Sequence, residues 1–371
     1  MKYCKNCVMP DTRPGIQFND KGICHACLVE QKKDQTDWDK RWKELQSLCD
    51  KYRDPKGSSY DCIIAVSGGK DSHTQVHVFK ELLNMNPLLV TVEDNFTLTE
   101  AGKHNLRNIS EAFGCDIISI KPNIKIQKAI TRYTFEKYAK PTWYIDRLIY
   151  TYPIHMALKF NIPLVIYGEN ISYEYGGHQQ DESPSAKNQI ENDVAGDFVT
   201  ELINEGFLEK ELVLCKYPSE EEINKSNLNP IYLSYYYRWN DYKNYITAKR
   251  HGFKDLENEW DRGHFIEFYQ QVDSMAYLVH PWLKYPKFGH ACATDVASRF
   301  IRLEMITRDE AIKLVKERDH NLDRKAIDDF CSFAGYTVKE FWDVVDRFYN
   351  KELFKKDKFD QWVLKDPIWK K

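Results

Sequence analysis

The sequence lacks long apolar stretches, and its longest hydrophobic runs are only a handful of residues within a chain of 371. A helix that spans a membrane needs about 20 mostly apolar residues, so we expect no membrane span. The first residues, MKYCKNCVMP, have no apolar core, so we expect no signal peptide and a cytoplasmic location. The formal net charge of −3 gives no polycationic surface, so we expect no general binding of nucleic acid.

The ten cysteines are the next informative feature, because no secretory signal accompanies them. Such cysteines indicate a reducing compartment and thiols that bind metal or act in catalysis. Cys4-x2-Cys7 and Cys24-x2-Cys27 form two pairs with sixteen residues between them. Four thiolates at this spacing suit tetrahedral Zn²⁺, so we predict a zinc ribbon over 1–35, while an iron–sulfur cluster would use the same ligands.

From residue 60 onward, short apolar strands alternate with helices. We expect strands at 60–66, 88–93, 115–120 and 163–168, and helices at 72–84, 99–113, 124–138 and 146–160. This alternation is typical of an α/β fold with a parallel sheet that is covered on both faces. In such sheets, ligands bind at the carboxyl ends of the strands.

The rest of the chain is less regular. Residues 36–59 are predicted to form a linker helix that ends at a breaker, and residues 171–230 are polar and irregular, as in an insertion or mobile loops. Residues 236–371 are expected to be mostly helical. Within them, a helix is expected to begin at Thr294 or Asp295, since both residue types are good N-caps.

The stretch CIIAVSGGKDS leads from a buried strand into a helix through two glycines. Gly68 and Gly69 allow positive φ and let another group approach the backbone. The amides that follow lie at a helix N-terminus, where free N–H groups and the helix dipole bind anions. Asp71 fits this site as a Mg²⁺ ligand or as a helix cap. The side chains that add charge or hydroxyl donors are Ser67, Lys70 and Ser72.

The S-G-G-K-D-S motif resembles the pyrophosphate loop of the N-type ATP pyrophosphatases, the PP-loop or adenine nucleotide alpha hydrolase-like enzymes. The resemblance implies a PP-loop domain over 60–235, in which ATP and Mg²⁺ adenylate a carbonyl oxygen, pyrophosphate leaves, and a nucleophile displaces AMP. The residues that it assigns to the nucleotide are Val66, Ser67, Gly68, Gly69, Lys70, Asp71, Ser72, Glu93, Gly168, Glu169 and Asn170.

The cysteine quartet, the glycine loop and the C-terminal third together resemble the N-acetyl sugar amidotransferases (WbpG/PseA-like) of bacterial surface-polysaccharide and flagellin-sugar biosynthesis. The further motifs that carry this resemblance are YGEN…YEYGG (167–177), YYYRWNDYKNYITAKRHGF (235–253) and KFGHACATDVASRFIRLEMITRDEA (287–311). It implies that ATP activates the acetamido oxygen of a nucleotide-linked N-acetyl sugar, and that ammonia then leaves an acetamidino group. The polar cluster expected to reach the substrates is Lys287, His290, Asp295, Arg299 and Arg302. The predicted catalytic residues are Lys70, Asp71, Lys287 and Asp295.

The source of ammonia is expected to be a separate class I glutaminase subunit. A class II glutaminase needs an N-terminal Cys, whereas the first Cys is residue 4. A class I enzyme needs a nucleophilic Cys in a glycine-flanked elbow, and Cys292 lacks that setting although His290 is nearby.

Two alternatives stay open at this stage. A PP-loop tRNA-thiolating enzyme would share the ATP chemistry, but it should carry a basic groove and a catalytic Cys pair, and the six remaining cysteines form no C-x-x-C. A zinc-ribbon scaffold with a nucleotide-sensing domain would need no catalysis, and the intact Lys70-Asp71 pair argues against it.

Overall fold

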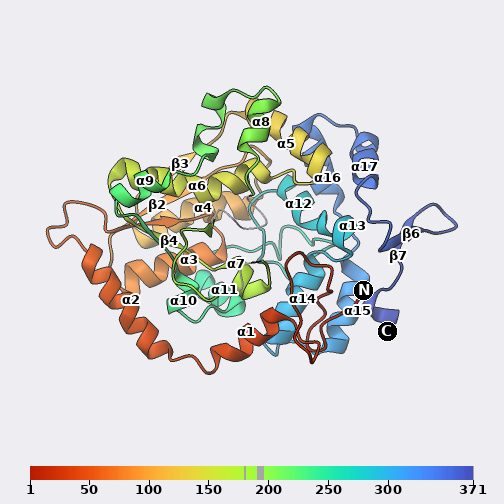
Figure 1. Cartoon of the computed structure of the whole chain (residues 1–371), viewed down its shortest axis with the longest axis horizontal. Coiled ribbons are helices and arrows are strands. Elements are labelled where there is room, and N and C mark those ends of the chain that lie inside the picture. Colours follow the sequence, from red (N-terminus) through yellow and green to blue (C-terminus); the bar gives the residue numbers. More distant parts are fainter. Residues whose placement is uncertain (179–180, 190–195, 371) are drawn as a thin grey trace.

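The computed structural model describes residues 1–178, 181–189 and 196–370, and within these residues five strands form one parallel sheet (Figure 1). The strands are β1 (Cys62–Ala65), β2 (Pro87–Val92), β3 (Ile117–Ile120), β4 (Leu164–Tyr167) and β5 (Asn229–Tyr232). Their order, β3-β2-β1-β4-β5, puts β1 in the centre. The chain forms β2 and then β3 on one side of β1, and it then crosses to the other side of β1 to form β4 and β5. The carboxyl end of β1 therefore lies at the position where such sheets bind ligands.

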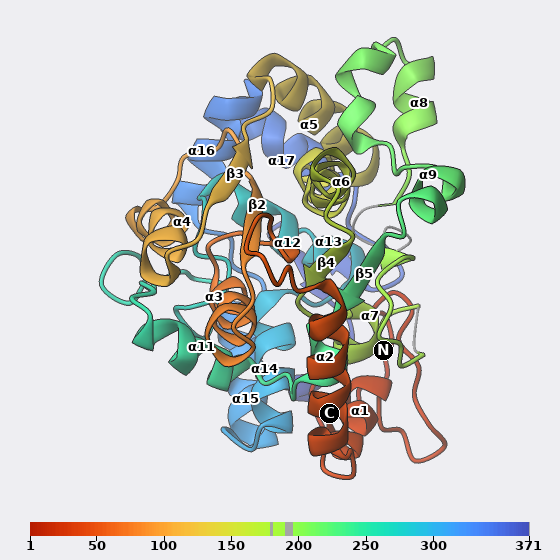
Figure 2. The same ribbon diagram turned by 90° about the vertical axis from the view of Figure 1, so that its left-hand side faces the viewer.

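The two faces of the sheet follow from the alternation of side chains along each strand. In β1, Ile64 belongs to a core with α2, α3 and α4, whereas the adjacent Ile63 belongs to a core with α6. Figure 2 shows α3 and α4 on one side of the sheet and α6 on the other. The helices involved are α2 (Trp38–Tyr52), α3 (Lys70–Val76), which runs into the π-helix η1 (His77–Leu82), α4 (Glu100–Phe113), α5 (Ile124–Tyr138) and α6 (Trp143–Phe160). The predicted α/β fold with a parallel sheet is confirmed.

The fifth strand, β5, is the part of the sheet that the sequence did not reveal. Its residues, NPIY, are too few to show an alternation, and Pro230 disfavours a strand unless it lies at a sheet edge. In the structure β5 pairs in parallel with β4 alone among the named strands. The expected irregular segment therefore ends in a strand. Elsewhere it contains the short helices α7 (Ile171–Tyr175), α8 (Val199–Asn204) and α9 (Glu220–Lys225). Residues 179–180 and 190–195 of that segment lie outside the described residues.

The C-terminal region is mostly helical, as predicted, with an additional hairpin of β6 (Phe354–Lys356) and β7 (Trp362–Leu364). The helices are α10 (Leu233–Tyr236), α11 (Asp241–Arg250), α12 (Val279–Trp282), α13 (Lys284–Phe288), α14 (Cys292–Arg302), α15 (Arg308–Arg318), α16 (Arg324–Ala334) and α17 (Val338–Asp346). Phe135 of α5 stacks on Phe341 with ring centroids 5.5 Å apart. The C-terminal core thus includes a helix that precedes it by about a hundred residues, and the predicted boundary at 235/236 stays a prediction.

The start of α14 differs from the prediction. The helix begins at Cys292, with Ala291 at the N-cap, so neither Thr294 nor Asp295 caps it. Asp319, which follows α15, supplies the cap instead: its carboxylate accepts hydrogen bonds from the amides of Ala291 and Thr294 at 2.9 and 3.0 Å. Asp319 is 25 positions away from Thr294 in the chain, so no local sequence pattern predicts that it caps this helix.

The N-terminal segment and the helix α1 (His25–Lys33) lie beside α14 and α15 (Figure 1). Val8 packs with Ala297, Ala311 and Val315 in one apolar cluster. The N-terminal segment therefore packs on the C-terminal region. Over the described residues, every helix is too short or too polar to cross a membrane.

Close packing at Gly102 of α4 gives a test of this arrangement. A Cβ atom there would lie 2.2 Å from the carbonyl oxygen of Asp273. Helix propensity alone would make Gly102→Ala stabilising by roughly 0.5–1 kcal/mol, but overpacking costs about 1–3 kcal/mol. We expect a lower free energy of unfolding in urea for Gly102→Ala. The control Gly196→Ala meets no atom of the described residues within 4 Å and should not show this loss. Gly102→Ala more stable than the wild type would contradict the packing.

Candidate active site

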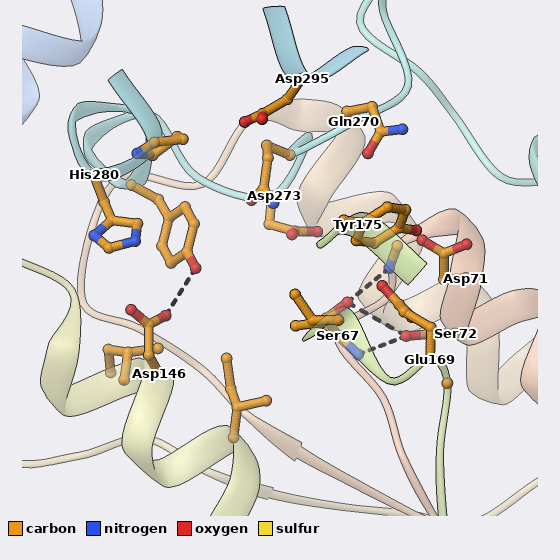
Figure 3. A pocket seen from close by; sticks show the side chains of 18 of the residues that line it. Ser67, Asp71, Ser72, Asp146, Glu169, Tyr175, Gln270, Asp273, His280 and Asp295 are labelled. Atoms are coloured by element: carbon orange, nitrogen blue, oxygen red, sulfur yellow. Dashed lines mark hydrogen bonds between the residues drawn. The ribbon is translucent and has the colours of Figure 1, made fainter. Parts of the chain in front are cut away.

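A cavity of about 730 Å³ opens at the carboxyl ends of β1, β2 and β4. Its walls come from parts of the chain that are far apart in sequence: Arg13 from the N-terminal segment, the glycine loop after β1, Asp146 from α6, and α12 to α14 from the C-terminal region. Figure 3 shows the glycine loop on one side of this cavity, and Asp146 and His280 on the opposite side. The site is therefore assembled by the tertiary fold.

The glycine loop is fixed by its backbone and its own hydroxyls. Gly68 has φ +85°, and a Cβ atom there would lie 3.0 Å from the amide nitrogen of Leu106, so only glycine fits. The amide of Ser67 donates to the Ser72 hydroxyl at 2.9 Å, and the amide of Gly69 donates to the Ser67 hydroxyl at 3.2 Å. Gly69 is the N-cap of α3 and offers no side-chain cap, which leaves first-turn amides for an anion.

Lys70 is buried and lies between two carboxylates. Its ammonium group is 2.6 Å from Asp71 and 2.8 Å from Asp241 of α11. Burial alone would lower the pKa of Lys70, but Asp241 and Asp71 outweigh it and raise that pKa. Asn244, one turn further along α11, donates to Asp71 at 2.8 Å. Sequence reasoning missed Asp241, although it lies in a segment that carried the family resemblance.

Asp241 holds three further groups together. Gln270 donates to both of its carboxylate oxygens at 2.6 and 2.7 Å, Tyr269 donates to one at 3.3 Å, and Arg299 lies 3.5 Å away. Burial raises the pKa of Asp241, but Lys70 and Arg299 bring it down to about 2. Asp241 is thus ionised at neutral pH and ties the glycine loop to the C-terminal region.

At the end of β4, the predicted residues Gly168 and Glu169 line the cavity, whereas the predicted Asn170 is not among the lining residues. A Cβ atom at Gly168 would be 3.0 Å from the Trp239 ring, so this glycine is required by packing. Burial and the charge of Asp71 raise the pKa of Glu169 to about 8, so this residue can donate a hydrogen bond at neutral pH. Asn170 caps α7, where its side chain accepts from the amide of Tyr173 at 3.2 Å.

The end of β2 brings further carboxylates to the cavity. Glu93, a predicted nucleotide residue, lines the wall and accepts a hydrogen bond from Ser119, and Val66 lines the wall beside the loop.

Asp146 and Asp273 also line the cavity and were not predicted. Burial raises the pKa of Asp146 to about 6 and that of Asp273 to about 7. These two residues lie far from any motif, so only the fold identifies them.

The predicted C-terminal cluster lines the same cavity, but its members do different things. Asp295 forms ion pairs with Arg13, at 2.9 Å, and with Lys284. Lys287 does not reach Asp295 and donates instead to the carbonyl of Ala139 at 2.9 Å. Thus Asp295 fastens the N-terminal segment to α14, while Lys287 lines the cavity and has no carboxylate partner in the part of the chain that the structure describes. The catalytic roles of Lys287 and Asp295 stay predictions.

The four predicted metal ligands converge. The sulfurs of Cys4 and Cys27 are 3.9 Å apart, those of Cys7 and Cys24 are 3.7 Å apart, and all four lie within 4.8 Å of one another. A tetrahedral zinc site with Zn–S bonds of ~2.3 Å has sulfurs ~3.8 Å apart, so the residues fit a single zinc ion. The amide of Cys24 donates to the Cys4 sulfur at 3.2 Å, as expected for a stabilised thiolate.

Comparison with known proteins relates the C-terminal region to a family. Residues 230–367 match a family model described as LPS biosynthesis protein WbpG-like, C-terminal domain. The C-terminal region is therefore similar to that of WbpG-like proteins. This matched region contributes Lys287 and Asp295 to the cavity wall, and its Asp241 lies behind the wall, 2.8 Å from Lys70.

Two other proteins are similar over part of their length. An uncharacterized protein of Methanocaldococcus jannaschii is 32% identical over 116 residues, which are 31% of this chain and 41% of that protein. The chain thus spans less than half the length of that curated relative. The NMN synthetase from Francisella tularensis aligns with a TM-score of 0.29 and 11% identity, over 52% of this chain and 93% of that one.

The cysteine site gives a prediction about metal removal. We expect about one zinc per chain by elemental analysis, loss of that zinc in Cys24→Ser, and a lower melting temperature after chelation, because metal binding contributes to folding. Cys115→Ala removes a thiol outside the cluster and should keep the metal. Iron with visible absorbance in the purified protein would contradict a zinc site.

The glycine loop gives a second prediction. Gly68→Ala adds both positive-φ strain, roughly 1–3 kcal/mol, and a contact with the backbone of α4, so ATP should bind about tenfold more weakly or worse. Gly57 also has positive φ but meets nothing within 4 Å, so Gly57→Ala is the matched control and should keep the ATP affinity. Isothermal titration calorimetry with ATP and Mg²⁺ measures both variants. Equal affinities would show that this loop does not hold the phosphates.

Proposed function

We propose that the chain is an AMP-forming, ATP-dependent amidotransferase that converts an acetamido group of a nucleotide-linked N-acetyl sugar to an acetamidino group. The pathway would be bacterial surface-polysaccharide (lipopolysaccharide, O-antigen) or flagellin-sugar (pseudaminic acid) biosynthesis. The observation that carries the proposal is the contact between Lys70 and Asp241, because it joins the glycine loop to the WbpG-like region in one cavity. In this proposal the ATP site and the region that is similar to WbpG-like proteins therefore serve the same cavity.

In this proposal the loop amides, Lys70 and the hydroxyls of Ser67 and Ser72 hold the β- and γ-phosphates. Mg²⁺ would neutralise phosphate charge, and the proposal assigns Asp71 and Glu93 as its carboxylate ligands. In the described residues, no three carboxylates of the cavity meet within ligand distance. That arrangement suits a Mg²⁺ ion that keeps waters and is held largely by the nucleotide's phosphates.

The chemistry needs ATP because an amide carbonyl is a poor electrophile. The acetamido oxygen attacks the α-phosphorus, and pyrophosphate leaves from the glycine loop. Ammonia then attacks the imidate carbon, AMP leaves with the former amide oxygen, and the nitrogen loses a proton. Glu169, with its raised pKa, can donate a hydrogen bond to the negative charge that develops on phosphate oxygens.

Ammonia would come from a separate class I glutaminase. Cys292 is buried, and burial raises the pKa of its thiol far above the usual value. A thiol in that state is a poor nucleophile, so the proposal assigns it no glutaminase role.

The test is incubation with ATP, Mg²⁺, ammonium and a panel of UDP- and CMP-linked N-acetyl sugars, with AMP, pyrophosphate and sugar mass measured together. We expect AMP, pyrophosphate and a sugar about one mass unit lighter, since NH replaces O. Lys70→Met should abolish turnover, because it removes the positive charge that would stabilise the leaving pyrophosphate and breaks the buried ion pair with Asp241. Lys103→Met, at an exposed position of α4, is the control and should retain turnover.

Glutamine in place of ammonium should give little product without a partner subunit, and equal rates would refute the two-subunit scheme. Salt-sensitive, tight binding of bulk tRNA, with no turnover of any sugar, would favour the tRNA-thiolating alternative.

A further inference from the structure

The end of the cavity opposite the glycine loop is rich in basic groups. Lys284 and Lys287 of α13 and Lys140 of the α5–α6 turn all line it, together with His280 of α12. Figure 3 shows His280 and Asp146 across the cavity from Ser67, Ser72 and Glu169. The cavity thus has a second basic end, separate from Lys70.

Lys287 pairs with no carboxylate of the described residues. It donates one hydrogen bond to the carbonyl of Ala139, and an ammonium group has three donors. Burial, Lys140 and Lys284 lower the pKa of Lys287 to about 7, and no carboxylate offsets them. Lys284 is different, because Asp295 neutralises it. A half-buried ammonium beside like charges is costly unless an anion joins it.

His290 supplies a second, independent observation. It lines the cavity, its side chain is 1% exposed, and among the described residues neither ring nitrogen has a hydrogen-bond partner. Its closest recorded acidic oxygen, on Asp295, is 4.0 Å away, beyond hydrogen-bonding distance. His280 likewise has an unpartnered ring nitrogen. Buried polar groups are normally satisfied, so unpartnered imidazole nitrogens that line the same cavity as Lys287 indicate a ligand with acceptor oxygens.

We propose that Lys287, His290 and His280 form a second phosphate-binding site, which holds the phosphate group of the nucleotide-linked sugar while ATP occupies the glycine loop. This inference rests on the proposed function for the identity of the ligand. Two polyanions in one cavity repel each other, and opposite ends keep their phosphates apart. The acetamido group would then lie between them, where Asp273 projects in Figure 3 and can accept sugar hydroxyls.

The experiment measures binding of inorganic pyrophosphate to the metal-replete protein whose glycine loop is already filled with α,β-methylene ATP and Mg²⁺. Calorimetry should show one further binding event. Lys287→Met and His290→Phe should each weaken it about tenfold or more, because each removes a hydrogen-bond donor to a charged oxygen. Lys287→Arg keeps the cation and should restore part of the affinity. Lys125→Met, on the exposed face of α5, should leave it unchanged.

Melting temperatures of the variants show whether each one folds, and His290→Phe keeps the test available if Lys287→Met does not. No second binding event, or wild-type affinity in both variants, would overturn the inference. This measurement needs no turnover, so it stands even if no sugar of the panel is modified and the proposed function fails.

Turnover separates phosphate binding from proton transfer. If Lys287 binds the sugar's phosphate, Lys287→Met should raise the KM for the sugar about tenfold and leave the KM for ATP unchanged. If Lys287 is instead the base that takes the proton of ammonium, kcat should fall, its pH dependence near 7 should disappear, and the KM for the sugar should stay the same. That second pattern would overturn the assignment of Lys287 to phosphate binding.

Discussion

The buried ion pair between Lys70 and Asp241 is the interaction on which the rest of the site depends. Breaking such a pair on one side leaves an uncompensated charge and typically costs about 3–5 kcal/mol. Here the pair also sets geometry, because α3 carries the glycine loop and α11 belongs to the WbpG-like region. Gln270 and Arg299 contact the same carboxylate, so several segments meet at one point.

A second tie fastens the N-terminal segment. Arg13 reaches Asp295 of α14 and also donates to the carbonyl of Gly176, so one side chain joins three parts of the chain. The cysteine cluster lies in the same segment and leaves no ligand position for substrate. Its geometry therefore favours a structural role, in which it holds the segment that closes one wall of the cavity.

The electrostatics of the cavity differ along its length. The glycine loop and Lys70 face one end, and Asp273, whose pKa is raised, lies in the middle. At the other end Asp146 lies with Lys287 and His280, and in the described residues His290 and one nitrogen of His280 lack hydrogen-bond partners. Local motifs revealed the first end, since an anion loop is encoded in consecutive residues. The other two arise where α6, α12 and α13 meet, so their chemistry appears only when the fold is assembled.

The sequence by itself determined four strands, the helices between them, the glycine loop and the four cysteine ligands, because each depends on local periodicity or on spacing within a short segment. Tertiary structure decided the features that depend on contacts between residues far apart in the chain. β5 exists as a strand because β4 offers an edge, α14 begins at Cys292 because Asp319 caps it, and Lys70 is held by Asp241. Burial, which sets the pKa of Glu169, is likewise a property of the whole fold.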